Sequence, residues 1–198
     1  MNYFISDLHF GHKNVLAFDN RPFKDIEEHD TELMRRWNDT VNIDDDVYVL
    51  GDISWHNVTK TIEIFEQLNG NKHLIIGNHD GRLLKNRELR AQFVEIEHYK
   101  KIQGEHERAI ILCHYPIPCF DQHLYGAYHF YGHVHNSFEW NMMERVRYEM
   151  KCLYDKECNM INVGCMMPYM DYTPKTSEMI VESFLSMTFT ADTLLREQ

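Results

Sequence analysis

The sequence contains no apolar run close to the roughly 20 residues that a membrane-spanning helix requires. The first residues, Met1-Asn2-Tyr3, enter an apolar segment directly, without the basic segment and apolar core of a signal peptide. From these absences we expect a cytoplasmic protein that does not insert into a membrane. No stretch rich in Pro, Gly or Ser divides the 198 residues, of which 43% are hydrophobic, so we expect a single domain over residues 1–198.

Positive charge and paired cysteines are also scarce. The chain has 20 Lys and Arg against 31 Asp and Glu, a formal net charge of -11, which argues against a broad basic face that coats nucleic acid. A short or single-stranded nucleic acid that reaches one local site is still compatible with this charge. The five cysteines lack the Cys-x-x-Cys spacing of a structural zinc site, so we expect reduced thiols.

The first half of the chain alternates apolar segments with helical patterns. Helical spacing of apolar residues predicts helices at 25–41 and 59–68, and further helical segments are expected at 12–18 and 82–92. Short apolar strands are expected at 3–6, 47–50 and 73–76, so right-handed crossovers should build a mostly parallel sheet. In the second half we expect strands at 93–102, 108–113, 145–153 and 159–163 and a helix at 176–187, which together indicate an α/β sandwich.

Five apolar strands each end in polar residues of the kinds that bind metals. The carboxyl ends of parallel strands meet at one edge of a sheet, so these residues should converge there. The residues that we expect to bind metal are Asp7, His9, Asp52, Asn78, His114, His133 and His135.

Three oxygen donors and four imidazoles are too many for one tetrahedral zinc ion. They suit two borderline divalent ions such as Mn, Fe, Co, Ni or Zn, with Mn favoured for activity. Two such ions about 3.5–4 Å apart need an anionic bridge, and Asp52, in the middle of the order, is the natural choice.

These motifs in this order resemble those of the calcineurin-like metallophosphoesterases. The resemblance rests on Asp7-x-His9, Gly51-Asp52, the Gly-Asn-His-Asp block at 77–80, His114 and Gly132-His133-x-His135. The block Asp7-Leu8-His9-Phe10-Gly11-His12, with Asn20-Arg21-Pro22-Phe23 after it, is more narrowly similar to small bacterial and phage phosphoesterases of that superfamily. The resemblance implies a metallo-dependent phosphatase-like fold, a four-layer α/β/β/α sandwich with two mixed β-sheets.

The resemblance also implies a role for each residue. One metal would be held by Asp7, His9, Asp52 and His135, and the other by Asp52, Asn78, His114 and His133. A hydroxide that bridges the metals would attack phosphorus in line. His79 would protonate or steer the leaving oxygen, with Asp80 holding its ring.

Two arginines of the protein phosphatases in this superfamily are missing, because Ile53-Ser54-Trp55 follows the second motif and Ile76 precedes Gly77. Without them a dianionic phosphomonoester would be held poorly, so the sequence favours hydrolysis of a phosphodiester, or of another small phosphorylated substrate. His12, Arg21 and Arg82 are candidate substrate-binding residues. The alternatives are a non-catalytic scaffold with this fold, or a nuclease that acts on short or single-stranded ends, which the acidic charge does not favour. The oligomeric state stays open.

Overall fold

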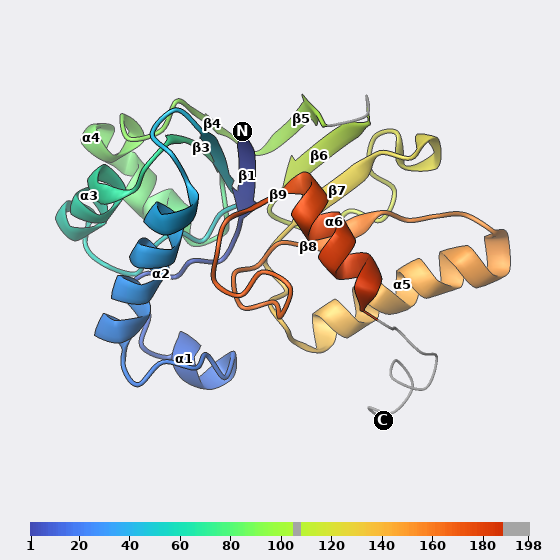
Figure 1. Cartoon of the computed structure of the whole chain (residues 1–198), viewed down its shortest axis with the longest axis horizontal. Coiled ribbons are helices and arrows are strands. Elements are labelled where there is room, and N and C mark those ends of the chain that lie inside the picture. The colour runs from blue at the N-terminus through green and yellow to red at the C-terminus, as the bar shows by residue number, and fades with distance from the viewer. Residues whose placement is uncertain (105–107, 188–198) are drawn as a thin grey trace.

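The computed structural model describes residues 1–104 and 108–187. Two β-sheets face each other between layers of helices (Figure 1). The first sheet has the strand order β4-β3-β2-β1-β9, and its neighbours are parallel except for β9. Its strands are β1 (Asn2–Ile5), β2 (Asp46–Val49), β3 (Asn71–Ile75), β4 (Glu95–Glu97) and β9 (Lys175–Thr176).

The second sheet has the order β5-β6-β7-β8, with an antiparallel β5·β6 pair followed by two parallel pairs. Its strands are β5 (Tyr99–Gln103), β6 (Ala109–Cys113), β7 (Tyr128–Tyr131) and β8 (Met160–Asn162). Both sheets are therefore mixed and flanked by helices, which confirms the predicted sandwich with two mixed sheets.

The helices α2, α3 and α4 lie beside the first sheet, and α5 and α6 lie beside the second (Figure 1). Side-chain caps begin all five of these helices. Asp25 accepts a hydrogen bond from the Glu28 amide, and Asn57, Asn86, Ser137 and Thr176 cap α3, α4, α5 and α6 in a similar way. The helices are α1 (Val15–Phe18), α2 (Ile26–Thr40), α3 (Val58–Gln67), α4 (Arg87–Arg90), α5 (Phe138–Tyr154) and α6 (Ser177–Ser186), with 3-10 turns η1 (Asp80–Lys85) and η3 (His123–Tyr125).

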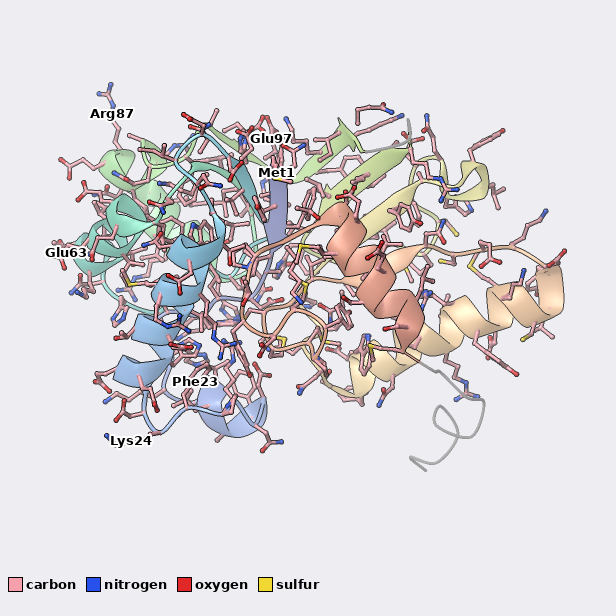
Figure 2. All side chains as sticks on the ribbon, viewed as in Figure 1. Met1, Phe23, Lys24, Glu63, Arg87 and Glu97 are labelled. Carbon is pink, nitrogen blue, oxygen red and sulfur yellow. The ribbon has the colours of Figure 1, made fainter. Side chains whose placement is uncertain are left out.

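Aromatic side chains join the two sheets in one core. Phe4 of β1 meets Phe130 of β7 edge to face, with ring centroids 5.0 Å apart, and stacks on Tyr48 of β2 at 5.5 Å. Such pairs add to the gain from burying the rings. Charged side chains such as Lys24, Glu63 and Arg87 lie at the periphery (Figure 2).

The predicted strand at 145–153 is wrong, because these residues form most of α5. Ser137 caps this helix by accepting from the Glu139 amide. Trp140, Met143 and Met150 recur at helical spacing and pack against a buried cluster in the second sheet. Apolar and polar residues alternate in this segment because the helix is buried along only one stripe and the rest of its surface is exposed.

Two other boundaries differ from expectation. The helical segment at 82–92 divides into η1 and α4. The strand expected at 93–102 divides into β4 and β5, which join different sheets, so the chain crosses from one sheet to the other there. All five cysteines are free, as predicted. In residues 1–104 and 108–187, no helix combines the length and apolar character needed to cross a membrane.

Candidate metal centre

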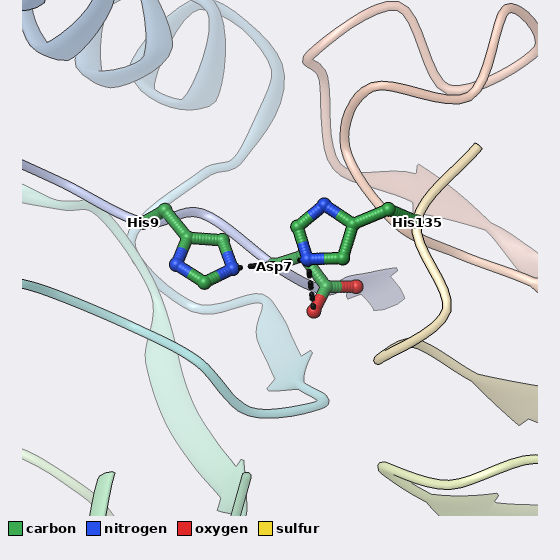
Figure 3. Close-up of side chains that lie close together, drawn as sticks. All are labelled: Asp7, His9 and His135. Atoms are coloured by element: carbon green, nitrogen blue, oxygen red, sulfur yellow. Dashed lines mark hydrogen bonds and ion pairs between the residues drawn. The ribbon is translucent and has the colours of Figure 1, made fainter. Parts of the chain in front are cut away.

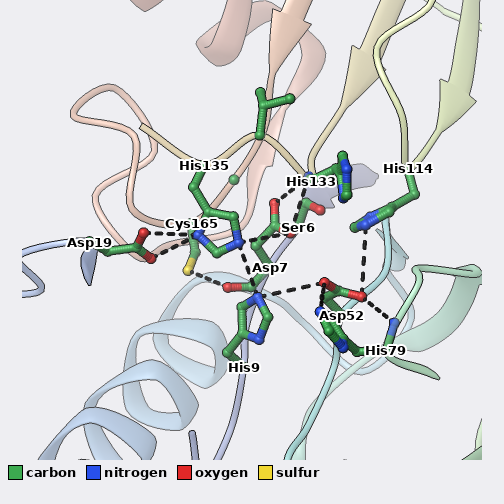
Figure 4. Close-up of polar contacts among 12 residues, drawn as sticks. Ser6, Asp7, His9, Asp19, Asp52, His79, His114, His133, His135 and Cys165 are labelled. Carbon is green, nitrogen blue, oxygen red and sulfur yellow. Dashed lines mark hydrogen bonds and ion pairs between the residues drawn. The ribbon is translucent and has the colours of Figure 1, made fainter. Parts of the chain in front are cut away.

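The polar strand ends come together where the two sheets meet. Ser6, just after β1, forms an isolated parallel bridge with Gly164, just after β8. Two backbone hydrogen bonds make this connection, from Ser6 N to Val163 O at 2.9 Å and from Cys165 N to Ser6 O at 2.9 Å. The loops that follow β1, β2, β3, β6 and β7 therefore open onto the same place (Figure 4).

The backbone at this place is unusual. Five of the seven predicted ligands have a left-handed backbone, with φ between 50° and 71°. Residues other than glycine adopt this conformation rarely, and such residues cluster at functional sites. The five are Asp7, His9, Asp52, His133 and His135.

A first group of ligand atoms is formed by Asp7, His9 and His135 (Figure 3). Nε2 of His9 and Nε2 of His135 lie 3.2 Å apart, and Nε2 of His135 lies 3.8 Å from Oδ1 of Asp7. Two donors bound at about 2.1 Å to one ion, at right angles, lie about 3 Å apart. The spacing of the two imidazoles thus suits one shared ion.

A second group contains Asp52 and His114 together with Asp7. Oδ1 of Asn78 lies 3.0 Å from Nε2 of His114 and 2.9 Å from Nδ1 of His133, so these two side chains extend the group. All seven predicted ligands are therefore brought together, and their assignment as metal ligands stays a prediction.

Asp52 lies between the two groups, and its two oxygens face different histidines. Oδ2 is 3.7 Å from Nε2 of His9, and Oδ1 is 3.7 Å from Nε2 of His114 (Figure 4). A carboxylate in this position could be shared by metal ions held by the two groups. Asp7 also belongs to both groups, a sharing that the sequence did not indicate.

Two of the imidazoles have their outer nitrogens engaged by the protein. Nδ1 of His114 donates to the carbonyl of Leu50 at 2.6 Å, and Nδ1 of His135 donates to the carboxylate of Asp19 at 2.9 and 3.0 Å. The lone pair on Nε2 of each ring then faces the cluster. Metal-binding histidines are commonly oriented in this way.

Three carboxylates are buried at this site, since Asp7, Asp52 and Asp80 are at most 2% exposed. Burial raises the pKa of Asp52, and the charges of Asp7 and Asp80 raise it further against an opposing effect of His114. Burial and the neighbouring His135 lower the pKa of His9 well below its usual value. A site that disfavours both buried anions and protonated imidazoles fits divalent cations, which offset the carboxylates and bind neutral rings.

Two glycines leave room for these carboxylates. A Cβ on Gly77 would lie 2.3 Å from Oδ1 of Asp52, and one on Gly132 would lie 2.0 Å from Oγ of Ser6 and 2.5 Å from Oδ2 of Asp7. The backbone therefore packs directly against the acidic side chains. The residues present therefore fit the binding of divalent metal ions.

The sequence predicted that Asp80 holds the ring of His79, but the structure gives Asp80 other partners. Its carboxylate accepts backbone hydrogen bonds from Asp52, Ile53 and Gly77 at 2.7–3.0 Å and so ties the second and third strand ends together. The His79 side chain is 46% exposed, and its Nε2 lies 3.9 Å from Oδ2 of Asp52. Burial lowers the pKa of His79 in spite of the Asp80 charge.

The structure does not support Arg21 as a residue that contacts substrate, because its side chain is fully buried. Its guanidinium donates to Asp19 Oδ2 and to the carbonyls of Asp7 and Leu8, at 2.9–3.1 Å. Arg21 thus fixes the backbone of the first motif. His12 lies at the rim, stacked on Trp55 with ring centroids 4.1 Å apart, and Arg82 is exposed near His79.

Several polar residues near the site were not identified from the sequence. Asp19 joins Arg21 to His135, and His29 contacts Arg21 through Nε2 at 2.9 Å and Asp30 through Nδ1 at 2.8 Å. Asp30 in turn contacts His56 at 2.7 Å. The one signal in the sequence is that Asp19 and Arg21 are two residues apart beside a turn, which is too common a pattern to single out.

Comparisons with known proteins place no named activity on these residues. No protein-family model matches the chain. An 80-residue segment is 45% identical to the uncharacterized protein MJ1445 of Methanocaldococcus jannaschii, and covers 39% of this chain and 46% of that protein. A segment of 89 residues is 42% identical to the gene 66 protein of Mycobacterium phage L5, and covers 43% of this chain and 42% of the phage protein. The matches thus span less than half of either relative.

The fold resembles that of a solved structure over almost the whole chain. The protein of unknown function AQ665 from Aquifex aeolicus superposes with a TM-score of 0.59 at 25% identity, over 92% of this chain and 98% of that one. This chain is therefore similar to AQ665 in its α/β architecture. Within this chain, aspartates and histidines form a potential metal site.

Proposed function

We propose that this chain is a metal-dependent phosphoric ester hydrolase of the calcineurin-like type, active on phosphodiesters. The observation that carries the proposal is the position of Asp52, whose two oxygens face His9 on one side and His114 on the other at 3.7 Å each. A carboxylate shared by two sets of nitrogen donors suits a two-metal site, of the kind that phosphatases and nucleases use to hydrolyse phosphoesters.

Two divalent ions bound there would lower the pKa of a water molecule and neutralise the charge that develops on the phosphoryl oxygens. In the reaction, the oxygen of water forms a bond to phosphorus, the ester P–O bond breaks, and the leaving oxygen takes up a proton. His79 is exposed beside Asp52 and is suited to protonate or steer that oxygen. No covalent intermediate with the protein is required.

The surrounding cations favour a diester over a monoester. Arg21 is buried and fully engaged, so it cannot hold a second phosphate charge. Within the described part of the chain, the arginine that borders the site and is exposed is Arg82. A monoanionic diester requires less cationic clamping than a dianionic monoester.

Turnover of bis-p-nitrophenyl phosphate by protein of known metal content, with Mn²⁺ added, tests the proposal. We expect turnover, and we expect EDTA to abolish it and Mn²⁺ to restore it. The Asp52→Ala variant should lose both turnover and bound metal. A folded, metal-loaded protein without turnover on mono-, di- and cyclic phosphoesters would contradict it and favour a scaffold.

A further inference from the structure

A pocket of about 220 Å³ lies beside the candidate metal centre. It shares His79 with the site, and its other walls are Ser54, Trp55, His56, Arg82 and Leu83. Sites that enclose a whole drug-sized ligand have about 300–1,000 Å³. The pocket therefore suits one arm of a substrate whose phosphate lies against the metal ligands.

The floor of the pocket is rigid and its polar groups already have partners. Oγ of Ser54 donates to the carbonyl of Phe10 at 3.3 Å and accepts from Oγ1 of Thr61 at 2.9 Å. The ring of His56 is held by Asp30 and packs so closely on Gly11 that a Cβ there would lie 2.6 Å from it. Recognition thus depends on the remaining walls, which are Trp55, His79, Arg82 and Leu83.

Trp55 supplies an aromatic wall of fixed orientation. Its indole stacks on His12, with planes 17° apart, and meets His79 with ring centroids 4.3 Å apart. The residue nevertheless remains 41% exposed. A large aromatic side chain that is exposed and held in place next to a reactive site is well suited to contact a planar ligand group.

Arg82 supplies an uncommitted cation on the same pocket. It is exposed, and in residues 1–104 and 108–187 no hydrogen bond or ion pair engages its guanidinium. A guanidinium can stack on a planar ring or donate hydrogen bonds to its polar edge. The overall charge of -11 still opposes a long polyanion, so the ligand that fits is small.

We propose that the pocket binds a planar aromatic ester arm of the substrate, so that the natural substrates are small nucleotide-type phosphodiesters. The arm that remains on the phosphate after cleavage lies against Trp55 and accepts hydrogen bonds from Arg82, while the phosphate lies at the metal ligands. This inference rests on the proposed phosphodiester hydrolysis. The bond made is from water oxygen to phosphorus and the bond broken is an ester P–O bond, so no further reactant is needed.

Binding without turnover gives the first test. Calorimetry on the unaltered, Mn²⁺-loaded chain should show adenosine 5′-monophosphate binding at least about tenfold more tightly than ribose 5-phosphate, which lacks the base. Trp55→Leu should remove this difference, Trp55→Phe should keep part of it, and Tyr125→Leu, at an 87% exposed residue outside the pocket, should leave it unchanged. Equal binding of the two ligands by the unaltered chain overturns the inference, and requires no variant to fold.

Turnover gives the second test. Bis-p-nitrophenyl phosphate and methyl p-nitrophenyl phosphate release the same phenol, but only the first has a second aromatic arm. We expect Trp55→Leu to lower kcat/KM about tenfold more for the first than for the second, a ratio in which intrinsic reactivity cancels. Equal losses on both substrates contradict the aromatic arm while leaving the hydrolase proposal intact. Absence of turnover on both contradicts the hydrolase proposal itself.

Discussion

The carboxylate of Asp19 connects His135 to Arg21. Its oxygens lie 2.9 and 3.0 Å from Nδ1 of His135, and Oδ2 accepts from Nε of Arg21 at 2.9 Å. Burial alone would lower the pKa of His135, but the hydrogen bond from its ring to Asp19 and the charge of Asp7 outweigh burial and raise it. Asp19 therefore both orients the imidazole and increases its basicity as a ligand.

We predict that Asp19→Asn weakens metal binding by about 10–100-fold, as loss of such a partner does in known metal sites. Metal titration followed by calorimetry measures this effect. Excess metal should restore much of the turnover, because the ligands themselves remain. Asp39→Asn, on the exposed surface of α2, is the matched control and should bind metal normally. Unchanged metal affinity in Asp19→Asn would show that His135 needs no such support.

The two histidines with different predicted roles should behave differently. His114→Ala removes a donor whose Nε2 faces both Asp52 and Asn78, so we expect loss of metal and of nearly all activity. His79→Ala should retain its metal and lose about 10²–10⁴-fold in turnover, the usual contribution of a general acid. Metal content by elemental analysis, measured with kcat, separates the two. Loss of metal in His79→Ala would mean that His79 is a ligand.

A methyl group on Gly132 should disturb the site through sterics alone. The new Cβ would collide with Ser6 and Asp7, so we expect Gly132→Ala to lose about 1–3 kcal/mol of stability and most of its metal affinity. Gly81→Ala is the control, since a Cβ there meets nothing within 4 Å. Urea unfolding and metal titration of both variants test this. Equal behaviour of the two variants would contradict the crowding at Gly132.

Much of the fold follows from local patterns, but some contacts do not. The spacing of Leu33 and Trp37 predicts α2 because that helix packs one regular stripe on the sheet. α5 was misread because its buried stripe is narrow and includes Glu144, a charged residue at 2% exposure that pairs with Arg147. An ion pair inside a helix face removes the apolar signal on which periodicity depends.

The metal ligands were accessible from the sequence because each follows a strand. The role of Asp80 was not, since a carboxylate beside a histidine in sequence gives no indication that it binds three backbone amides instead. Asp19 and Asp30 were missed for a related reason. Their partners lie 116 and 26 residues away, and only the folded chain brings them together.

His129 should make stability depend on pH. It is fully buried, and burial lowers its pKa to about 4. The unfolded chain therefore binds a proton at this ring between about pH 6.5 and pH 4 that the folded chain does not. We predict that His129 does not change the free energy of unfolding above pH 6.5. As the pH falls from 6.5 to 4, His129 should lower the free energy of unfolding by about 3 kcal/mol.

Urea unfolding of the metal-free protein at several pH values measures this loss. His129→Gln preserves a donor and an acceptor at the site but does not titrate, so its stability should fall less steeply between pH 6.5 and 4. Parallel curves for the variant and the unaltered chain would assign the acid sensitivity to other groups.

The bridge between Ser6 and Gly164 has a consequence for how the molecule comes apart. This bridge lies beside the candidate metal centre, so the two sheets cannot separate without breaking its hydrogen bonds. Amide protons of Ser6 and Cys165 should then exchange with deuterium only through global opening. Unfolding of either sheet would therefore remove the whole metal site. No partly folded state would keep the ligands of one sheet in place.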